Sequence, residues 1–330
     1  MKNLHIFFKA KFLIFLVLGY FLFNGAIIFC KNNSSAITYV LNRGRFGDHL
    51  LNYCKAKWIS YKYDIPFFYV PFKYSDRLKI GDIENVCHSG LERNFKRKFR
   101  FEKKTDVKVD RENSCLYISN CYALINVDWD DKDFIGEIKK TISPKISIPK
   151  HDIPKDRISV AVHVRKGGGY DEPLLKDPDA NKRGQRFGYF ADKVYPIKFP
   201  PDSYYIEQIR KMYELLDNVP LYVFIFTDDH TPKRIVEKFE KNLCDLDIVF
   251  SCRGSGNHHD KNVIEDFFGM TQYDCLIRNG SHFSFFADVI GEFKVVIYPE
   301  DAYWKDGEIV IDNVKVKINK SCYARISSNT

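Results

Sequence analysis

The sequence predicts an α/β protein with two domains, each built around a parallel β-sheet, preceded by an N-terminal transmembrane helix. Three features indicate this fold class. The N-terminus carries a long apolar run, short apolar segments then alternate with amphipathic stretches, and a proline-containing segment interrupts that alternation near the middle of the chain. With 330 residues, of which 45% are hydrophobic, the chain is long enough for two domains of ordinary size.

The apolar run covers residues 12–30, and Lys2, Lys9 and Lys11 precede it. A run of this length can cross a bilayer as a helix, and the lysines favour a cytoplasmic N-terminus. We therefore expect a single-pass type II membrane protein. Its first segments are a cytoplasmic tail at 1–11, a signal anchor at 12–30 and a linker at 31–35.

A cleaved signal peptide is the alternative interpretation of this N-terminus. Gly25 and Ala26 are small residues that suit a cleavage site. The apolar run continues past them to Phe29, which favours the anchor. With an anchor, we expect the chain in the Golgi or endoplasmic reticulum if its source is eukaryotic, and in the inner membrane if it is bacterial.

The first domain is expected over residues 36–150. Short runs of β-branched and aromatic residues predict its strands, and stretches with apolar residues on one face predict its helices. The expected elements are strands at 36–41, 67–70 and 115–119 and helices at 49–63 and 132–142.

A proline-containing segment at 143–155 marks the boundary with the second domain, which we expect over 151–300. Strand and helix alternate clearly here, so the sheet should be parallel with helices on both faces, as in a Rossmann-like domain. The expected strands are 158–164, 221–226, 247–251, 275–277 and 294–298, and the expected helices are 202–216, 231–243, 262–273 and 284–291. A C-terminal extension at 301–330 should hold a hairpin at 308–318 that turns at Asp312–Asn313.

Lysine and arginine outnumber acidic residues by 51 to 43, which gives a net charge of +8 and favours anionic partners. Much of this excess lies in residues 93–108. A solvated surface is the simplest interpretation of such a run. The alternatives are a membrane-surface or acceptor-binding patch, or a nucleic-acid binder. No nucleic-acid-reading motif accompanies the charge, so we expect no nucleic-acid partner.

The chain has nine cysteines, which is many for a cytosolic protein, and all but Cys30 follow the apolar run. An even set of eight is compatible with disulfides in an oxidising compartment. The absence of a CxxC pair argues against structural zinc. Sequons at Asn32, Asn33, Asn279 and Asn319 fit a secretory-pathway protein.

Polar residues follow the predicted strand 158–164 at the end where α/β sheets bind their ligands. His163 and Arg165 alternate along this strand, so both should face the same side. Three glycines, at 167–169, come next. Glycines let backbone N–H groups approach a phosphate, and arginine offers its oxygens a forked donor. The segment indicates a diphosphate site, with a flexible loop carrying surface cations as the alternative.

Two further segments carry polar groups in similar places. Asp228 and Asp229 follow the strand at 221–226 and could accept hydrogen bonds from ribose hydroxyls, bind a metal, or cap the next helix. Asp266 lies in a predicted helix, and 281–284 begin the next one. A carboxylate can bind the edge of a purine, and a helix N-terminus favours phosphate; a simple helix cap at Ser281 is the alternative.

Together, these segments resemble the donor-domain motifs of the α-1,2-fucosyltransferase family and of its α-1,6- and protein O-fucosyltransferase relatives. The matching segments are His163-Val164-Arg165, Phe226-Thr227-Asp228-Asp229, Asp266-Phe267 with Met270, and Gly280-Ser281-His282-Phe283-Ser284-Phe285-Phe286. Gly44-Arg45-Phe46-Gly47-Asp48-His49 is similar to the family's amino-terminal glycine-containing turn. The resemblance runs from about residue 36 to residue 299.

The resemblance implies a GT-B arrangement, with two Rossmann-like domains facing across a cleft and GDP-fucose bound to the second. It implies an inverting glycosyltransferase that passes fucose to a hydroxyl of a glycan or glycoprotein without a metal or other cofactor. By position, Arg165 would hold the β-phosphate and stabilise its departure. The other implied donor-binding residues are His163, Asp228, Asp266, Ser281, His282 and Ser284, and Gly44, Arg45 and Gly47 would form the cleft loop.

The chain departs from the family at two places. Lys166 and the glycines replace the residues that usually follow the histidine and arginine, and Asp48-His49 replace an Asn-Gln pair. An inverting transfer uses a base on the acceptor hydroxyl, for which Asp48, His49 and Asp171 are candidates. The alternatives are another nucleotide sugar on the same fold, or an inactive relative that binds glycan or a partner protein at the membrane.

Overall fold

The computed structural model describes residues 35–101, 108–111, 113–120, 123–166 and 195–319. The expected tail and anchor at 1–30 lie outside these residues. No helix within the described ranges is long and apolar enough to cross a membrane.

The chain divides into two compact units. The first comprises Met1–Arg43, Leu51–Phe72 and Gly81–Asp128, and the second comprises Gly44–Leu50, Lys73–Ile80 and Trp129–Thr330. The division falls at residue 128, where the sequence suggested a boundary near 150. Two short segments of the N-terminal half belong to the second unit, including the first turn of the helix α2 (Phe46–Tyr63).

The first unit is built on a small parallel sheet with the strand order β1-β5-β4. Its strands are β1 (Ala36–Tyr39), β5 (Cys115–Ser119) and β4 (Arg97–Arg100). A second parallel pair joins β2 (Phe68–Tyr69) and β3 (Asn85–Val86). Most of the short helix α3 (Ile80–Ile83) and all of η2 (Leu91–Asn94) also belong to this unit, whereas η1 (Ser75–Arg77) belongs to the second unit. Aromatic side chains fill the core, where the ring of Tyr39 stacks on that of Phe67 at 6.0 Å between centroids.

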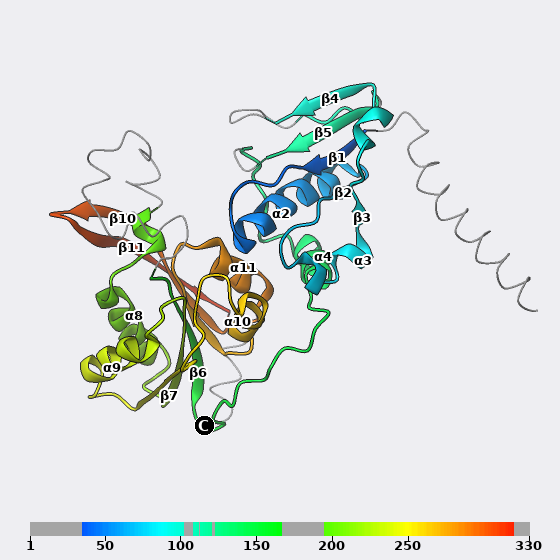
Figure 1. Ribbon diagram of the computed structural model, residues 1–330. Helices are drawn as coiled ribbons and strands as arrows, with labels where there is room; N and C mark the ends of the chain where they lie inside the picture. The colour runs from blue at the N-terminus through cyan, green and yellow to red at the C-terminus, as the bar shows by residue number, and fades with distance from the viewer. Residues whose placement is uncertain (1–34, 102–107, 112, 121–122, 167–194, 320–330) are drawn as a thin grey trace, which may run out of the picture. The chain divides into compact units, whose positions relative to one another are not determined.

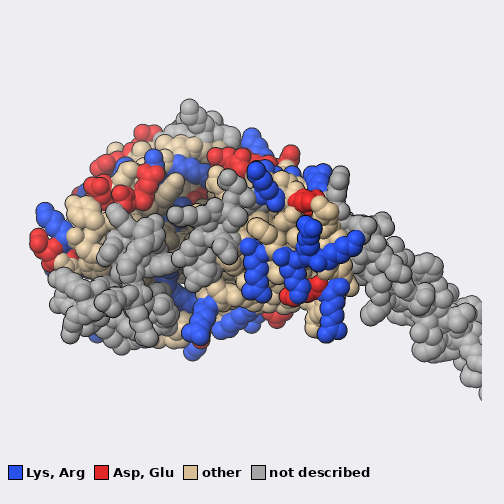
Figure 2. All heavy atoms as spheres, turned by 90° about the horizontal axis from the view of Figure 1, so that it is seen from above, with Lys and Arg blue, Asp and Glu red and all other residues tan. Residues whose placement is uncertain are grey.

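The strand β4 was not expected, because it lies within the basic run at 93–108. All four of its side chains are exposed, which agrees with a solvated surface for this part of the run. Figure 2 shows Lys and Arg side chains gathered over part of the molecular surface. Six of the cysteines lie in the described ranges, and all six are free thiols, so no disulfide joins any two of them.

The second unit holds a six-stranded sheet with the order β11-β10-β9-β6-β7-β8 (Figure 1). Its strands are β6 (Ile158–Val164), β7 (Leu221–Thr227), β8 (Ile248–Cys252), β9 (Cys275–Ile277), β10 (Val295–Lys305) and β11 (Glu308–Ile318). Every neighbouring pair is parallel except β10 with β11, which is antiparallel. The helices are α4 (Lys132–Thr141), α7 (Tyr195–Lys198), α8 (Asp202–Leu215), α9 (Pro232–Asn242), α10 (Val263–Met270) and α11 (His282–Ile290). The expected mixed α/β fold with parallel sheets is confirmed.

The two faces of β6 have different neighbours, because successive side chains of a strand point to opposite faces. Val160, Val162 and Val164 join the apolar cluster that also contains residues of α8 and α9. Figure 1 shows α8 and α9 on one side of the sheet and α10 and α11 on the other. His163 points toward the second group, since its ring lies 5.5 Å from that of Phe283 in α11.

The C-terminal hairpin differs from the expectation. Residues 308–318 form a single strand, so the turn expected at Asp312–Asn313 is wrong. The chain reverses instead at Asp306–Gly307, where Lys305 pairs with Glu308. Both turn residues have positive φ, of 51° and 83°, as the tight turns of two-residue hairpins require. The Asp-Gly pair was the available signal, and the hairpin extends the sheet of the second unit.

Candidate functional site

A cavity of about 180 Å³ lies in the second unit, at the carboxyl ends of β6 and β7. All its lining residues belong to that unit, including those of 44–49 and 73–74. The expected site residues on its wall are Gly44, Arg45, Gly47, Asp48, His49, His163, Arg165, Asp228, Asp266, Ser281 and His282. Ser284 does not line it, and Asp171 lies outside the described residues.

Parallel pairing brings the first two motifs together. In the register of β6 and β7, Val164 lies opposite Thr227, so the residues that follow each strand meet at one edge. There the backbone N–H of Lys166 donates to Oδ1 of Asp228 at 2.8 Å. Burial raises the pKa of Asp228, against the effect of this hydrogen bond and of the nearby charge of Arg165. Asp228 therefore holds the backbone of Lys166 and contributes a carboxylate to the wall.

Arg165 supplies a fixed cation at the base of the cavity. Its side chain is buried, and its guanidinium carbon lies 4.9 Å from the centre of the Phe199 ring. Arginine keeps its charge in such surroundings and presents a planar fork of donors. A charge placed among apolar groups interacts strongly with an anion, because little solvent screens it.

His163 is a neutral neighbour of this cation. Burial, assisted by the charge of Arg278, lowers the pKa of His163 to about 4. Its Nδ1 atom is buried and has no hydrogen-bond partner among the described residues. His163 lines the cavity and presents an uncharged imidazole to it.

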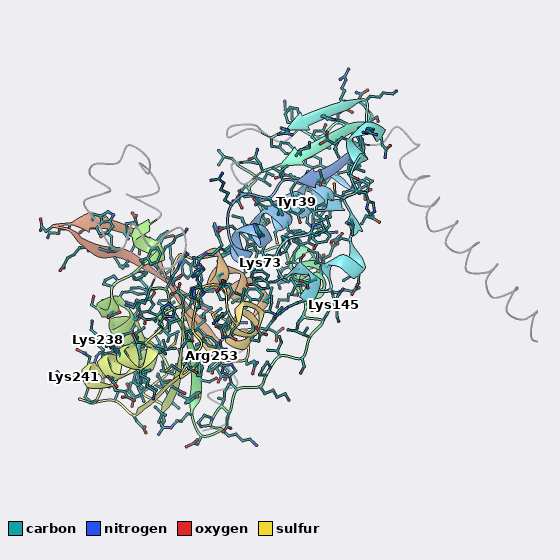
Figure 3. The ribbon with its side chains drawn as sticks, viewed as in Figure 1. Tyr39, Lys73, Lys145, Lys238, Lys241 and Arg253 are labelled. Atoms are coloured by element: carbon teal, nitrogen blue, oxygen red, sulfur yellow. The ribbon has the colours of Figure 1, made fainter. Side chains whose placement is uncertain are left out.

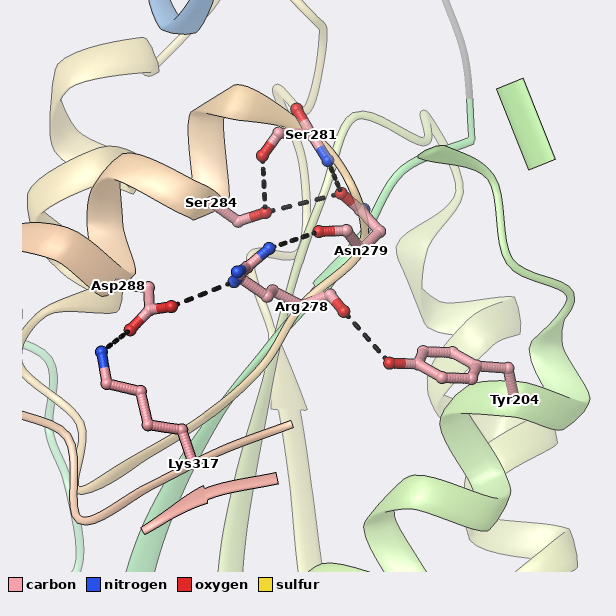
Figure 4. A network of polar contacts seen from close by, with 7 residues as sticks. All are labelled: Tyr204, Arg278, Asn279, Ser281, Ser284, Asp288 and Lys317. Atoms are coloured by element: carbon pink, nitrogen blue, oxygen red, sulfur yellow. Dashed lines mark hydrogen bonds and ion pairs between the residues drawn. The ribbon is translucent and has the colours of Figure 1, made fainter. Parts of the chain in front are cut away.

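The third motif is held in place by Asn279, whose side chain is fully buried (Figure 4). Its Nδ2 donates to the carbonyl of His163 at 3.0 Å, and its Oδ1 accepts from the N–H of Ser281 at 2.9 Å. Ser281 caps α11 by accepting from the N–H of Phe283 at 3.3 Å. The Ser284 hydroxyl donates to Asn279 and to the carbonyl of Ser281, both at 3.4 Å. Ser284 thus supports the turn, and a glycan on the buried Asn279 is excluded.

Sequence reasoning missed the ion pair beneath this turn. Nε of Arg278 lies 3.3 Å from Oδ2 of Asp288, and both side chains are 8% exposed. Burial lowers the pKa of Arg278, while the charge of Asp288 opposes that change. Figure 4 shows the pair linked to Lys317, whose Nζ lies 3.3 Å from Oδ1 of Asp288. Nothing local in the sequence signals this pairing.

A second missed pair faces the cavity directly. Nδ1 of His282 lies 2.7 Å from Oδ1 of Asp48, and the N–H of Arg45 donates to the other oxygen at 3.1 Å. Burial acts to raise the pKa of Asp48, but the hydrogen bond and charge of His282 outweigh it, so the pKa is lowered. An ionised carboxylate only accepts hydrogen bonds. Nδ1 of His282 therefore donates to this carboxylate.

Gly47 allows these residues to meet. A Cβ at this position would lie 2.5 Å from the backbone nitrogen of Phe283 and 2.7 Å from the carbonyl carbon of His282. The first turn of α2 therefore rests directly against the first turn of α11. This close approach places the glycine-containing turn at 44–49 on the cavity wall, as the sequence suggested.

Asp266 lies on another part of the wall and pairs with Arg253, which Figure 3 labels. Burial raises the pKa of Asp266 to about 6, although the Arg253 charge opposes this. The lining as a whole is cationic, with five Lys and Arg side chains against four Asp. Since Asp48, Asp260 and Asp266 each pair with a histidine or arginine, the arrangement suits an anionic ligand.

No protein-family model and no curated protein matches this sequence. Among solved structures, the chain is similar to a mutant of Arabidopsis thaliana FUT1 in complex with GDP, with a TM-score of 0.49 and 10% identity over 83% of this chain and 71% of that one. It is also similar to NodZ α-1,6-fucosyltransferase soaked with GDP-fucose, with a TM-score of 0.48 and 12% identity over 87% and 100% of the two chains. A third similar structure is that of the fucosyltransferase NodZ from Bradyrhizobium, with a TM-score of 0.44 and 11% identity over 87% of this chain and 99% of that one. At such identities, the function is argued from the residues of the site.

The buried pair predicts the effect of Asp288→Asn. The change leaves the Arg278 charge buried without its counter-ion, so we expect a loss of about 3–5 kcal/mol in the free energy of unfolding. Urea denaturation measures it. Asp245→Asn is the matched control, because Asp245 pairs with Arg210 at an exposed site and its loss should lower the stability far less. The double change Arg278→Met with Asp288→Leu should recover most of the lost stability. Equal losses of stability for Asp288→Asn and Asp245→Asn would contradict the importance of the buried pair.

The neutral His163 predicts a pH dependence. The folded chain keeps the ring neutral down to a pKa of about 4, whereas the unfolded chain takes up the proton near 6.5. Between these values the unfolded state binds more protons, so stability falls as the pH drops from 6.5 to 4, by roughly 3 kcal/mol in total.

His163→Gln should remove this part of the pH dependence of the urea midpoint. His88→Gln, at an exposed histidine of the first unit, is the control for losing an imidazole. A His163→Gln variant whose stability falls as steeply with acid as that of the parent chain would show that the ring is not kept neutral.

Proposed function

We propose that the chain is a glycosyltransferase that binds a nucleotide-sugar donor in this cavity. The observation that supports it most is the meeting of Arg165, the neutral His163 and the N-terminus of α11 at one end of a parallel sheet. A helix N-terminus and a buried arginine both favour a diphosphate. GDP-fucose is the proposed donor, on the resemblance of the motifs, with another nucleotide sugar as the alternative.

Departure of the nucleoside diphosphate is the step that Arg165 would assist. When the bond between the sugar and the diphosphate breaks, negative charge grows on the diphosphate and the sugar becomes oxocarbenium-like. A fixed cation stabilises this charge more in the transition state than in the ground state. His163 would contact the donor through its ring nitrogen, and Asp266 would accept hydrogen bonds from the nucleobase of the donor. The transfer itself would need no metal.

Asp48 and His282 are the proposed base for the acceptor hydroxyl. With its Nδ1 proton donated to Asp48, His282 holds a lone pair on Nε2, the arrangement by which a carboxylate orients a histidine base. Removal of the hydroxyl proton would accompany attack at the anomeric carbon, on the side opposite the departing diphosphate, and so invert it. His49 lies on the same wall and stays an alternative, as does Asp171.

The rest of the proposal concerns the acceptor and the setting of the enzyme. The acceptor is a hydroxyl of a glycan or glycoprotein, presented by a first domain that faces the second in a GT-B arrangement. The helix at 12–30 would anchor the chain in a membrane. An inactive relative that binds glycan or a partner protein is the competing proposal, and it predicts donor binding without turnover.

Calorimetry on the 330-residue chain tests the donor. GDP, GDP-fucose, GDP-mannose and UDP-sugars are titrated into the protein without added metal. Saturable binding of GDP-fucose supports the proposal, and preference for another nucleotide sugar keeps the fold but replaces fucose. A folded protein that binds none of them is not a glycosyltransferase of this kind.

Arg165→Ala should lower the transfer rate on the order of a hundredfold or more, because the lost cation acts on the departing diphosphate. Arg165→Lys should recover only part of the rate, since a lysine offers a single point charge. Release of GDP under saturating donor and acceptor measures the effect. Arg210→Ala, which removes an exposed arginine of α8, is the matched control. An Arg165→Ala rate close to that of the parent chain would place the cation elsewhere.

Asp48→Asn and His282→Gln should lower the transfer rate by roughly 10²-fold or more, the usual contribution of a general base. Their affinity for GDP should change far less, because the base acts on the acceptor. Calorimetry with GDP and initial rates of transfer separate the two effects. A rate unchanged in both variants removes this pair from the mechanism, and a parallel loss of GDP affinity assigns it to donor binding.

A further inference from the structure

Three consecutive residues that follow β8 bring their side chains together on the cavity wall. They are His258, His259 and Asp260, and the atoms through which they could bind a metal all lie within 4.8 Å of one another. The rings of His258 and His259 are 4.0 Å apart between centroids. The mechanism proposed above uses none of these residues.

The backbone of this loop is fixed by hydrogen bonds that leave the three side-chain groups to one another. Nδ2 of Asn257 donates to the carbonyl of Arg253 at 2.9 Å, and Nδ2 of Asn262 donates to the carbonyl of Gly256 at 3.2 Å. The hydroxyl of Tyr74 donates to the carbonyl of Asp260 at 2.7 Å. The loop is therefore shaped before any ligand arrives, which lowers the entropic cost of binding one.

The contact between His258 and Asp260 explains the position of only two of the three side chains. Nδ1 of His258 contacts Oδ1 of Asp260, and this pair needs no third group. His259 nevertheless packs against His258, and the ring of His230 lies 5.4 Å from that of His258 on another side. Lys73 also acts on Asp260 and is a cation that a bound metal would have to tolerate.

We propose that His258, His259 and Asp260 form a binding site for a divalent transition metal. Two imidazoles and one carboxylate are a ligand set for Zn²⁺, Co²⁺ or Mn²⁺, whereas Mg²⁺ and Ca²⁺ prefer oxygen ligands alone. Three protein ligands leave at least one coordination position for water or a ligand oxygen.

The place of the site in the cavity gives it a consequence for binding, which rests on the proposed function. His259 is close enough to Asp228 for its charge to affect the pKa of that carboxyl. A divalent cation here adds positive charge to the wall that faces an anionic donor. The metal would strengthen nucleotide binding by several-fold, and binding of either ligand would promote binding of the other. The departure step stays with Arg165.

Metal binding is tested without any nucleotide. The 330-residue chain, freed of metal with a chelator, is titrated with Zn²⁺ by calorimetry and with Co²⁺ by visible absorption, where imidazole ligands give d–d bands. We expect about one equivalent to bind. The triple variant His258→Ala, His259→Ala, Asp260→Asn should lose it, and His88→Ala should keep it.

The result that overturns the site is the absence of stoichiometric binding, or binding that survives the triple variant. Because the loop is only partly buried, the triple variant should keep the thermal unfolding midpoint of the parent chain. If it does not, the single variant His259→Ala replaces it, with a tenfold or greater loss of Zn²⁺ affinity expected.

Titration of GDP with and without Zn²⁺ tests the coupling. Tighter GDP binding in the presence of the metal, absent from the triple variant, supports it, and equal affinities overturn it. A chain that binds Zn²⁺ but no nucleotide under either condition refutes the proposed function and leaves the metal site standing. Failure of the proposed function can therefore be distinguished from failure of the metal site.

Discussion

The amide of Asn279 is the contact on which the candidate site depends. It joins the carbonyl of His163, at the end of β6, to the N–H of Ser281, which caps α11. A buried amide that lost either partner would cost the desolvation free energy of the unpaired group. The two structural elements therefore keep a fixed separation. The buried pair of Arg278 and Asp288 holds the same turn from below, so that a strand end and a helix start form one rigid wall.

This rigid wall sets the charges of the cavity. His163 and Arg165 both line the cavity, yet burial acts on them differently. It keeps the imidazole neutral, whereas arginine has no neutral form within reach. The result is one cation beside an uncharged ring, in surroundings that screen charge poorly. An anionic group entering the cavity meets charge that is already in place.

The parts of this arrangement that the sequence predicted are those governed by local rules. The strands at 115–119, 158–164 and 275–277 agree with the structure at both ends, because buried parallel strands are continuous apolar runs. The two-residue period of a strand predicted that His163 and Arg165 lie close together, and both line the cavity. Ser284 is buried and does not line the cavity. A serine near a helix start can either contact a ligand or bury its hydroxyl, and only the packing around it decides between the two.

The pair of Asp48 and His282 could not be predicted, because 234 residues separate its members and no local pattern joins them. The two side chains differ in the chemistry that each is suited to. Asp48 lies in the first turn of α2, where the helix dipole favours a carboxylate, and His282 lowers its pKa further. A carboxylate that holds its charge so readily is a weak base. Asp48 is therefore better suited to orient the imidazole of His282 than to accept a proton itself.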